Sequence, residues 1–276
     1  MKPLLTRSLT SLIYAVVMTA GIIIHPILFA VVFLALTILG LLEFYKLMKL
    51  AGVEPERITG LATGILFFLS VFGFVSHLLP FFAVLAVIPM FFLTFIVELY
   101  RKKENPIHNI ACNLLGFLYV VFPMSLSCFL VFPGLPNNPK FYPWILFGIS
   151  ITIWAYDSGA YLVGTSFGRH RLFERISPKK SWEGVIGGGM VALLVGVLNA
   201  WLFQNLEITG WMAISVIVVI FGTLGDLVES MMKRSLDLKD SGSLLPGHGG
   251  ILDRLDSFYF TVPAVVLFLL FMGLKY

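Results

Sequence analysis

Charged residues are scarce in this sequence of 276 residues. Only 12% of the residues are charged and 58% are hydrophobic, and the mean hydropathy is +0.95. Soluble domains typically carry about 25% charged residues, so this composition excludes an ordinary water-soluble domain and indicates a chain surrounded by lipid. The formal net charge of +4 comes from short basic clusters between apolar runs. A nucleic-acid partner needs one continuous basic stripe, which these clusters do not form.

Cysteine is also rare: the chain has two, Cys112 and Cys128, inside one apolar stretch. Their spacing matches no metal or redox motif, which excludes a disulfide framework and indicates two packing residues. A cleavable secretory signal is not expected either. Lys2 and Arg7 precede an apolar run at 9–24, but no small-x-small cleavage site follows, so we interpret this run as the first transmembrane helix.

The long apolar runs lack the period-two alternation of barrel strands, which leaves helices as the only spanning structure. A helix needs roughly 20 apolar residues to cross the hydrocarbon core. The sequence also lacks internal repeats and the paired Gly/Pro-broken helices that mark many transporters. It therefore predicts an all-α, polytopic transmembrane bundle of about nine spans, near 8–24, 27–46, 58–79, 81–99, 110–132, 143–165, 184–204, 211–229 and 257–274.

The positions of Lys and Arg predict the orientation of these spans, because cytoplasmic loops are enriched in both residues. With a cytoplasmic amino terminus, all but two of the 19 Lys and Arg residues fall on the inner side of the membrane. The exceptions are Lys140 and Lys275. We therefore expect a multi-pass protein of the inner (cytoplasmic) membrane with its amino terminus inside the cell.

Two loops on the expected cytoplasmic side, 166–183 and 230–256, are long and rich in polar residues. Long loops of this kind commonly carry function. We therefore divide the chain into N-terminal transmembrane helices at 1–140 (spans one to five) and a catalytic transmembrane region at 141–276 (spans six to nine). The active site is expected in the second region, on the cytoplasmic side.

Acidic residues gather where the second loop meets its flanking spans. Asp226 and Glu229 are three residues apart, as are Asp253 and Asp256, so each pair shares one face of a helix. A charge deep in a span costs on the order of 2.5–3.5 kcal/mol, so it normally has a partner. Carboxylates are the ligands that Mg²⁺ prefers, usually one or two from the protein, completed by waters and phosphates. We therefore predict that these helix ends hold one or two metal ions.

Basic residues and glycines accompany the acids. Gly249 and Gly250, next to His248, permit positive φ and would let backbone N–H groups approach a phosphate closely. Each feature alone also has a structural explanation, because cytoplasmic Lys and Arg follow from topology and a glycine-rich stretch is commonly a turn. The basic side chains that would neutralise a nucleotide and a second phosphate are Lys233, Arg234, Lys239 and Arg254.

A second group of polar residues lies in the sixth predicted span and the loop after it. Asp157 stands well inside the span, and an acid within the membrane is a candidate functional residue, the alternative being a polar contact between helices. Ser177, Lys179, Lys180 and Ser181 precede the seventh predicted span. Hydroxyl and N–H donors converge on phosphate at such a helix start, and an ordinary N-cap beside topogenic lysines is the alternative.

Small residues open the seventh predicted span, at Gly184, Gly187, Gly188 and Gly189. Spacings of three and four residues let two helices approach closely, so we predict packing here and no chemistry. Trp211 begins the eighth predicted span and is expected to be an interfacial anchor.

The carboxy-terminal half resembles the phosphatidate cytidylyltransferases, also called CDP-diacylglycerol synthases. The resemblance is carried by a signature from Ser230 to Asp256 that reads S-x₂-KR-x₄-KD-x-G-x₂-LP-x-HGGI-x-DRLD, with every fixed position matched. Two further blocks, WA-x-DSGAY from Trp154 and SPKKSWEG from Ser177, are also similar to family blocks. Residues 1–140 match only as a run of hydrophobic helices.

This resemblance implies Mg²⁺-dependent transfer of CMP from CTP to phosphatidic acid, with release of pyrophosphate, in a homodimer. Asp226 and Asp253 match metal ligands for one or two divalent ions, with or without a monovalent cation. The matches predicted to act in catalysis are Asp157, Lys233, Asp240, His248 and Asp256. Those predicted to bind substrate are Ser177, Lys179, Lys180, Ser181, Arg234, Lys239, Gly249, Gly250 and Arg254.

The expected reaction is in-line attack of a phosphate oxygen of phosphatidic acid on the α-phosphorus of CTP. Such transfers need positioning and charge neutralisation more than a nucleophilic side chain, although Asp157 or His248 would be placed to move a proton. Two alternatives stay open from the sequence. One is a CTP-dependent lipid kinase-like transferase, which would release CDP, and the other is a cation-coupled transporter that uses Asp157 and Asp226.

Overall fold

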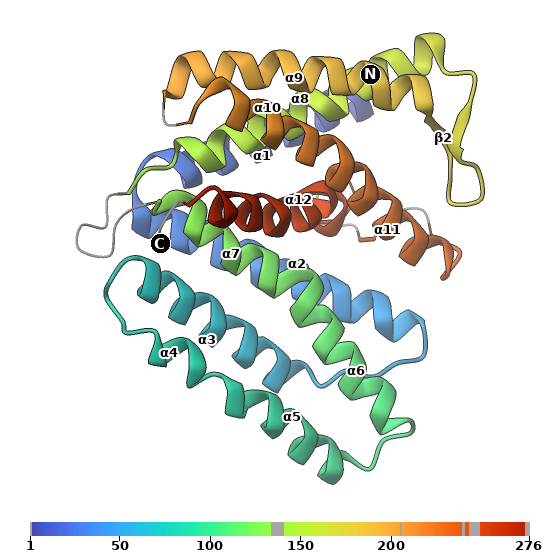
Figure 1. The fold of residues 1–276 in the computed structure, drawn as a ribbon. Helices are drawn as coiled ribbons and strands as arrows, with labels where there is room; N and C mark the ends of the chain where they lie inside the picture. Colours follow the sequence, from blue (N-terminus) through green and yellow to red (C-terminus); the bar gives the residue numbers. More distant parts are fainter. Residues whose placement is uncertain (1, 134–140, 205, 239–240, 243–248, 274–276) are drawn as a thin grey trace. The chain divides into compact units, whose positions relative to one another are not determined.

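The computed structural model describes residues 2–133, 141–204, 206–238, 241–242 and 249–273 and is almost wholly helical (Figure 1). Eight of its helical stretches are long and apolar enough to cross a membrane: Pro26–Leu50, Arg57–Val75, Phe82–Arg101, Pro106–Val131, Trp144–Phe167, Trp182–Phe203, Ile208–Arg234 and Leu252–Phe271. The first predicted span falls on α1 (Lys2–Ile23), whose apolar part Thr10–Ile23 is shorter. The prediction of an all-α multi-pass bundle is confirmed.

The chain forms two compact units. The first contains the residues up to Tyr142 together with the part of 240–254 that the structure describes. The second contains the described residues of 143–239 and of 255–273. The chain therefore leaves the second unit after α11, contributes a short segment to the first unit, and returns within α12.

The helices of the first unit pack around phenylalanine side chains. Phe29, Phe33, Phe44 and Phe68 are fully buried, and the rings of Phe29 and Phe33 lie 4.3 Å apart. The unit is built from α1, α2 (Pro26–Leu50), α3 (Arg57–Val75), α4 (Phe82–Leu85), α5 (Ile88–Arg101), α6 (Pro106–Gly116), the π-helical turn η1 (Phe117–Val121) and α7 (Phe122–Val131).

Buried acids of the first unit are paired at helix ends. Glu56 caps α3 by accepting from the N–H groups of Ile58 (3.0 Å) and Thr59 (2.5 Å). Burial alone would raise the pKa of Glu56, but these hydrogen bonds outweigh it and hold the pKa below its usual value. Glu98 on α5 is buried and binds Arg101 (2.5 Å) and Asn109 (2.6 Å). Each carboxylate is compensated locally, as a low-dielectric environment requires.

The second unit begins with two helices, α8 (Trp144–Phe167) and α9 (Trp182–Phe203), that lie side by side and are joined by a small β-hairpin (Figure 1). The hairpin pairs β1 (Arg171–Phe173) antiparallel with β2 (Ser177–Ser181), Arg171 lying opposite Ser181. It was not predicted from the sequence. The unit continues with α10 (Ile208–Ile217), the π-helical turn η2 (Val218–Gly222), α11 (Thr223–Arg234) and most of α12 (Leu252–Phe271).

Helix α11 runs five residues beyond the predicted end of the eighth span. Its last turn carries an i,i+4 ion pair between Lys233 Nζ and Glu229 Oε2 at 2.5 Å, and basic residues at a helix C-terminus are favoured by the helix dipole. Lys233 and Arg234 are therefore helical residues, and Asp253 and Arg254 likewise belong to the first turn of α12.

Glycines let α8 and α9 approach closely, as predicted. A Cβ atom on Gly184 would lie 2.9 Å from Ala160 O, and one on Gly188 would lie 2.8 Å from both Tyr156 O and Ala160 Cβ. Gly189 points elsewhere, and its Cβ would meet nothing closer than Val219 at 3.6 Å. The two adjacent glycines thus differ sharply in the space around them.

We expect Gly188→Ala to lower the free energy of unfolding by about 1–3 kcal/mol, because the added methyl group collides with the backbone of α8. Gly189→Ala is the matched control. It should raise stability by about 0.5–1 kcal/mol, because alanine loses less conformational freedom than glycine in a helix. Thermal unfolding of both variants in the same detergent tests the pair, and equal unfolding temperatures would contradict the packing described here.

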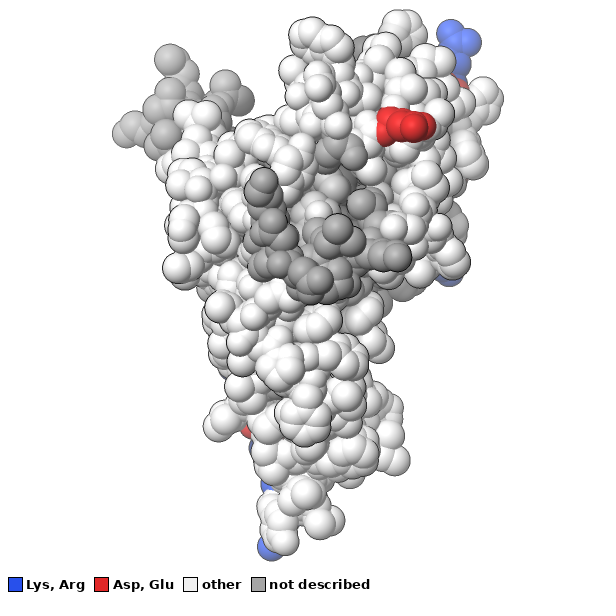
Figure 2. Space-filling model, turned by 60° about the vertical axis from the view of Figure 1, so that its left-hand side comes forward, with Lys and Arg blue, Asp and Glu red and all other residues white. Residues whose placement is uncertain are grey.

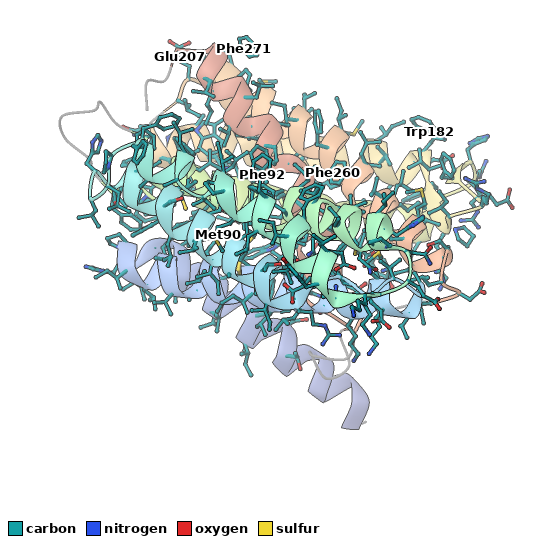
Figure 3. All side chains as sticks on the ribbon, turned by 90° about the horizontal axis from the view of Figure 1, so that it is seen from below. Met90, Phe92, Trp182, Glu207, Phe260 and Phe271 are labelled. Atoms are coloured by element: carbon teal, nitrogen blue, oxygen red, sulfur yellow. The ribbon has the colours of Figure 1, made fainter. Side chains whose placement is uncertain are left out.

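The outer surface is apolar, as expected for contact with lipid. Large hydrophobic side chains such as Phe92 on α5 and Phe271 on α12 are 65% and 83% exposed and point outward (Figure 3). Charged side chains are few on the face drawn in Figure 2. The prediction that Trp211 is an interfacial anchor is wrong. Its side chain is fully buried, because Gly148 on α8 leaves room for the ring.

Candidate active site

A cavity of about 280 Å³ opens within the second unit. Helix α8, strand β2, the first turn of α9 and helix α11 supply its walls. The lining residues are Tyr156, Asp157, Ala160, Tyr161, Gly164, Thr165, Lys179, Lys180, Ser181, Gly184, Val185 and Asp226. Two acids, two lysines and several hydroxyl groups therefore share a space that is lined elsewhere by small or apolar groups.

Helix α8 contributes one face to the cavity. Asp157 and Tyr161 are four residues apart, so their side chains lie on the same face of the helix, about one turn from each other. Both side chains are exposed and line the cavity. Tyr156 is buried and its hydroxyl group hydrogen-bonds with Thr223 Oγ1 on α11, whose hydroxyl donates to Val219 O at 2.6 Å. This contact fixes α8 against α11 beside the acids.

The β-hairpin brings Lys179, Lys180 and Ser181 to the N-terminus of α9. Its base is closed by the Trp182 N–H, which donates to His170 O at 2.9 Å. Ser181 caps α9, its Oγ accepting from the Gly184 N–H at 3.2 Å. The predicted phosphate-binding residues at this helix start are thus held in a defined turn, with both lysines lining the cavity.

An ion pair joins the hairpin to α11. Lys180 Nζ lies 2.5 Å from Asp226 Oδ2, and Ser230 Oγ donates to Asp226 Oδ1 at 3.2 Å. The Lys180 and Asp226 side chains remain 24% and 32% exposed, so solvent screens the pair and it contributes little to stability. Asp256, partly buried on α12, feels the charges of Asp226, Asp157 and Lys180. Three predicted acids of the second unit therefore lie within electrostatic reach of one another.

The donor set in the cavity fits a hard divalent cation. Among the described residues, no group of three or more His, Cys, Asp and Glu side chains is arranged so that it could hold a metal ion without other ligands. Magnesium needs less than that, because it commonly takes one or two protein carboxylates and completes its shell with waters and substrate phosphates. Asp157 and Asp226 supply two carboxylates to the same cavity, and Asp226 Oδ2 lies against the ammonium group of Lys180.

The remaining predicted metal ligand, Asp253, belongs to the first unit. Its Oδ2 atom accepts from the N–H groups of Ser241 (3.1 Å) and Gly250 (2.8 Å), and Ser241 Oγ lies 3.0 Å away. Because Asp226 and Asp253 lie in different units, their joint binding of a metal stays a prediction. Gly249 has φ +80°, the left-handed conformation that glycine permits. Arg254 is exposed, and its carbonyl accepts from the Tyr14 hydroxyl at 3.3 Å.

Other predicted residues lie away from the cavity lining. Lys233 is paired with Glu229, Arg234 donates to Leu238 O at 2.9 Å, and Ser177 begins β2 opposite Phe173. Their roles in substrate binding stay predictions. Lys239, Asp240 and His248 lie outside the described residues.

Some lining residues were not predicted as site residues. Tyr156, Tyr161 and Thr165 share the cavity with Asp157, and Tyr161 and Thr165 follow Asp157 at spacings of four and eight residues. That helical spacing was the available signal, because residues one and two turns after an intramembrane acid share its face.

Comparison with known proteins shows the family of the chain. The model of the cytidylyltransferase family matches residues 5–272. The phosphatidate cytidylyltransferase of Synechocystis sp. is 38% identical over 261 residues, covering 85% of each chain. Those of Bacillus subtilis and Staphylococcus aureus are each 33% identical, over 259 and 272 residues, covering 93% and 96% of this chain and 94% and 98% of their own. The chain belongs to the cytidylyltransferase family.

Proposed function

We propose that the protein transfers CMP from CTP to phosphatidic acid, producing CDP-diacylglycerol and pyrophosphate. The cavity that joins Asp157, Lys179, Lys180 and Asp226 carries this proposal, in a chain whose relatives are phosphatidate cytidylyltransferases over nearly their full length. Two anionic phosphates repel each other, so a site that brings them together must place positive charge between them. The lysines and a carboxylate-bound cation would supply that charge.

The chain's own residues would act by positioning and neutralisation. Lys179 and Lys180 reach the cavity from the hairpin and would hold phosphate oxygens of CTP. Asp226 would hold Mg²⁺, which when bound would supply Lewis-acid neutralisation of the phosphates. The attacking oxygen of phosphatidic acid is already anionic at neutral pH, so no nucleophilic side chain is required. Asp157, which is exposed in the cavity, would be placed to accept a residual proton.

The proposed site lies at headgroup level on the cytoplasmic side of the inner membrane. Trp182, the first residue of α9, is 54% exposed and projects from the helix end beside the hairpin (Figure 3). Tryptophan is enriched at the membrane interface, so this position supports a cavity that both a lipid phosphate and a water-soluble nucleotide can reach. The charge distribution of the loops supports the cytoplasmic orientation, and we expect a homodimer.

Position-specific labelling of CTP tests the proposal. With purified protein, Mg²⁺ and phosphatidic acid, label at the α-phosphate should enter the lipid while label at the γ-phosphate should leave as pyrophosphate. Transfer of γ-label to lipid would instead identify a CTP-dependent lipid kinase. Cation uptake into proteoliposomes without any labelled lipid would identify a transporter. The names of the relatives favour neither of these alternatives.

A further inference from the structure

Glu43 is a buried acid on α2 that belongs to none of the sequence motifs described above. Only 7% of its surface is exposed, although it stands in an otherwise apolar transmembrane helix. An acid in such a helix normally has a partner and a reason to be there. The partners of Glu43 are Ser241 and Ile251, which lie 198 and 208 residues further along the chain.

The two carboxylate oxygens of Glu43 bind the two ends of the same segment. Glu43 Oε1 accepts from the Ser241 hydroxyl, and Oε2 accepts from the Ile251 N–H at 2.8 Å. All three residues belong to the first unit. Glu43 extends from a rigid helix, α2, and binds both Ser241 and Ile251. It therefore fixes the distance between Ser241 and the start of α12.

The glycines beside these contacts make room for the Glu43 carboxylate. A Cβ atom on Gly250 would lie 1.5 Å from Glu43 Oε1, and one on Gly242 would lie 2.9 Å from Glu43 Cδ. A side chain at Gly250 would therefore displace the carboxylate. Two glycines of the signature are thus explained by a contact with α2, whatever their own part in binding substrate.

The contacts continue from Glu43 to Asp253. Ser241 Oγ lies within hydrogen-bond distance of Glu43 Oε1 and of Asp253 Oδ2, the second at 3.0 Å. Asp253 Oδ2 also accepts from the N–H groups of Ser241 and Gly250. Ser241 therefore contacts both the carboxylate of Glu43 on α2 and that of Asp253, the predicted metal ligand.

We propose that Glu43 is a positioning residue for the reaction: it holds Ser241 and Ile251 in place, and through Ser241 it orients the carboxylate of Asp253. Its effect on turnover rests on the proposed function, but its effect on the segment does not. A displacement of about 1 Å in a reacting group can cost on the order of 100-fold in rate. Glu43 would prevent such a displacement without contacting substrate.

Two substitutions separate hydrogen bonding from charge. Glu43→Ala removes both acceptors and leaves the Ile251 N–H without its partner. Glu43→Gln keeps the geometry, because the amide oxygen can accept from Ile251 while the amide nitrogen donates to Ser241 Oγ, whose single proton then goes to Asp253. Glu98→Ala is the matched control, since it removes another buried glutamate of the same unit that binds Arg101 and Asn109 instead.

Hydrogen–deuterium exchange of residues 249–254 and steady-state kinetics with CTP provide two independent readouts. We expect Glu43→Ala to accelerate exchange of the Ile251 amide roughly tenfold, as loss of one hydrogen bond predicts. Its kcat should fall about 100-fold, with a smaller change in KM. Glu43→Gln should restore both properties, and Glu98→Ala should lower thermal stability without changing exchange at 249–254.

The proposal is overturned by either of two results. Unchanged exchange in Glu43→Ala would show that Glu43 does not hold the segment. Loss of activity in Glu43→Gln with normal exchange would show that the reaction uses the charge itself. If the unmodified protein made no CDP-diacylglycerol, the proposed function would fail, whereas the exchange experiment would still decide whether Glu43 holds residues 241 and 251.

Discussion

Asp226→Asn should abolish most synthesis of CDP-diacylglycerol while the protein stays folded. Asparagine keeps the shape of the side chain but removes the charge that attracts Lys180 and the proposed divalent cation. Loss of one preorganised charge in a site of this kind lowers kcat on the order of 10²–10³-fold. The partly exposed ion pair contributes only about 0–1 kcal/mol, so thermal unfolding should shift little. Activity in mixed micelles, measured beside thermal unfolding, tests both parts.

Asp237→Asn is the matched control for this substitution. Asp237 is exposed, follows the same helix, and has φ +54°, a conformation that asparagine adopts as readily as aspartate. It lines no part of the described cavity, so its activity should stay normal. Near-normal activity of Asp226→Asn would refute the role given to Asp226, whereas equal losses in both variants would indicate a general effect of net charge.

The transmembrane helices could be predicted from hydropathy because each is determined by its own residues. The predicted span at 143–165 and the helix Trp144–Phe167 nearly coincide. The β-hairpin could not be predicted in the same way. Its strands have only three and five residues, and β2 consists mostly of charged and polar side chains, so neither alternation nor β-propensity was visible.

The candidate site could be predicted in part. Asp157 and Asp226 were recognised as acids within apolar spans, and the structure places both on one cavity with Lys179 and Lys180. The same rule applies to Glu43, which stands in a predicted span and was overlooked beside the denser motifs. Its contact with Ser241 joins positions 198 residues apart. Such a contact leaves no periodicity in one sequence, so only the folded chain reveals it.

Lys180→Met should reduce activity as strongly as Asp226→Asn. Methionine has a similar length but no charge, so the cavity loses the ammonium group nearest to Asp226. We expect kcat/KM for CTP to fall by about 100-fold or more, because a charge placed for phosphate binding acts most strongly in the transition state. Lys180→Arg should retain an intermediate activity, since it keeps the charge but changes the geometry of its donors. Lys46→Met, at an exposed position on α2, should be nearly silent.

The double variant Lys180→Met/Asp226→Asn distinguishes substrate binding from a simple structural ion pair. If the two side chains only neutralised each other, removing both would leave no unpaired charge, and activity would recover toward that of the unmodified protein. If Lys180 holds phosphate and Asp226 holds a cation, the double variant lacks both groups. Its activity should then be no higher than that of the less active of the two single variants. Recovery in the double variant would contradict the proposed roles, because the substrate would then need neither charge.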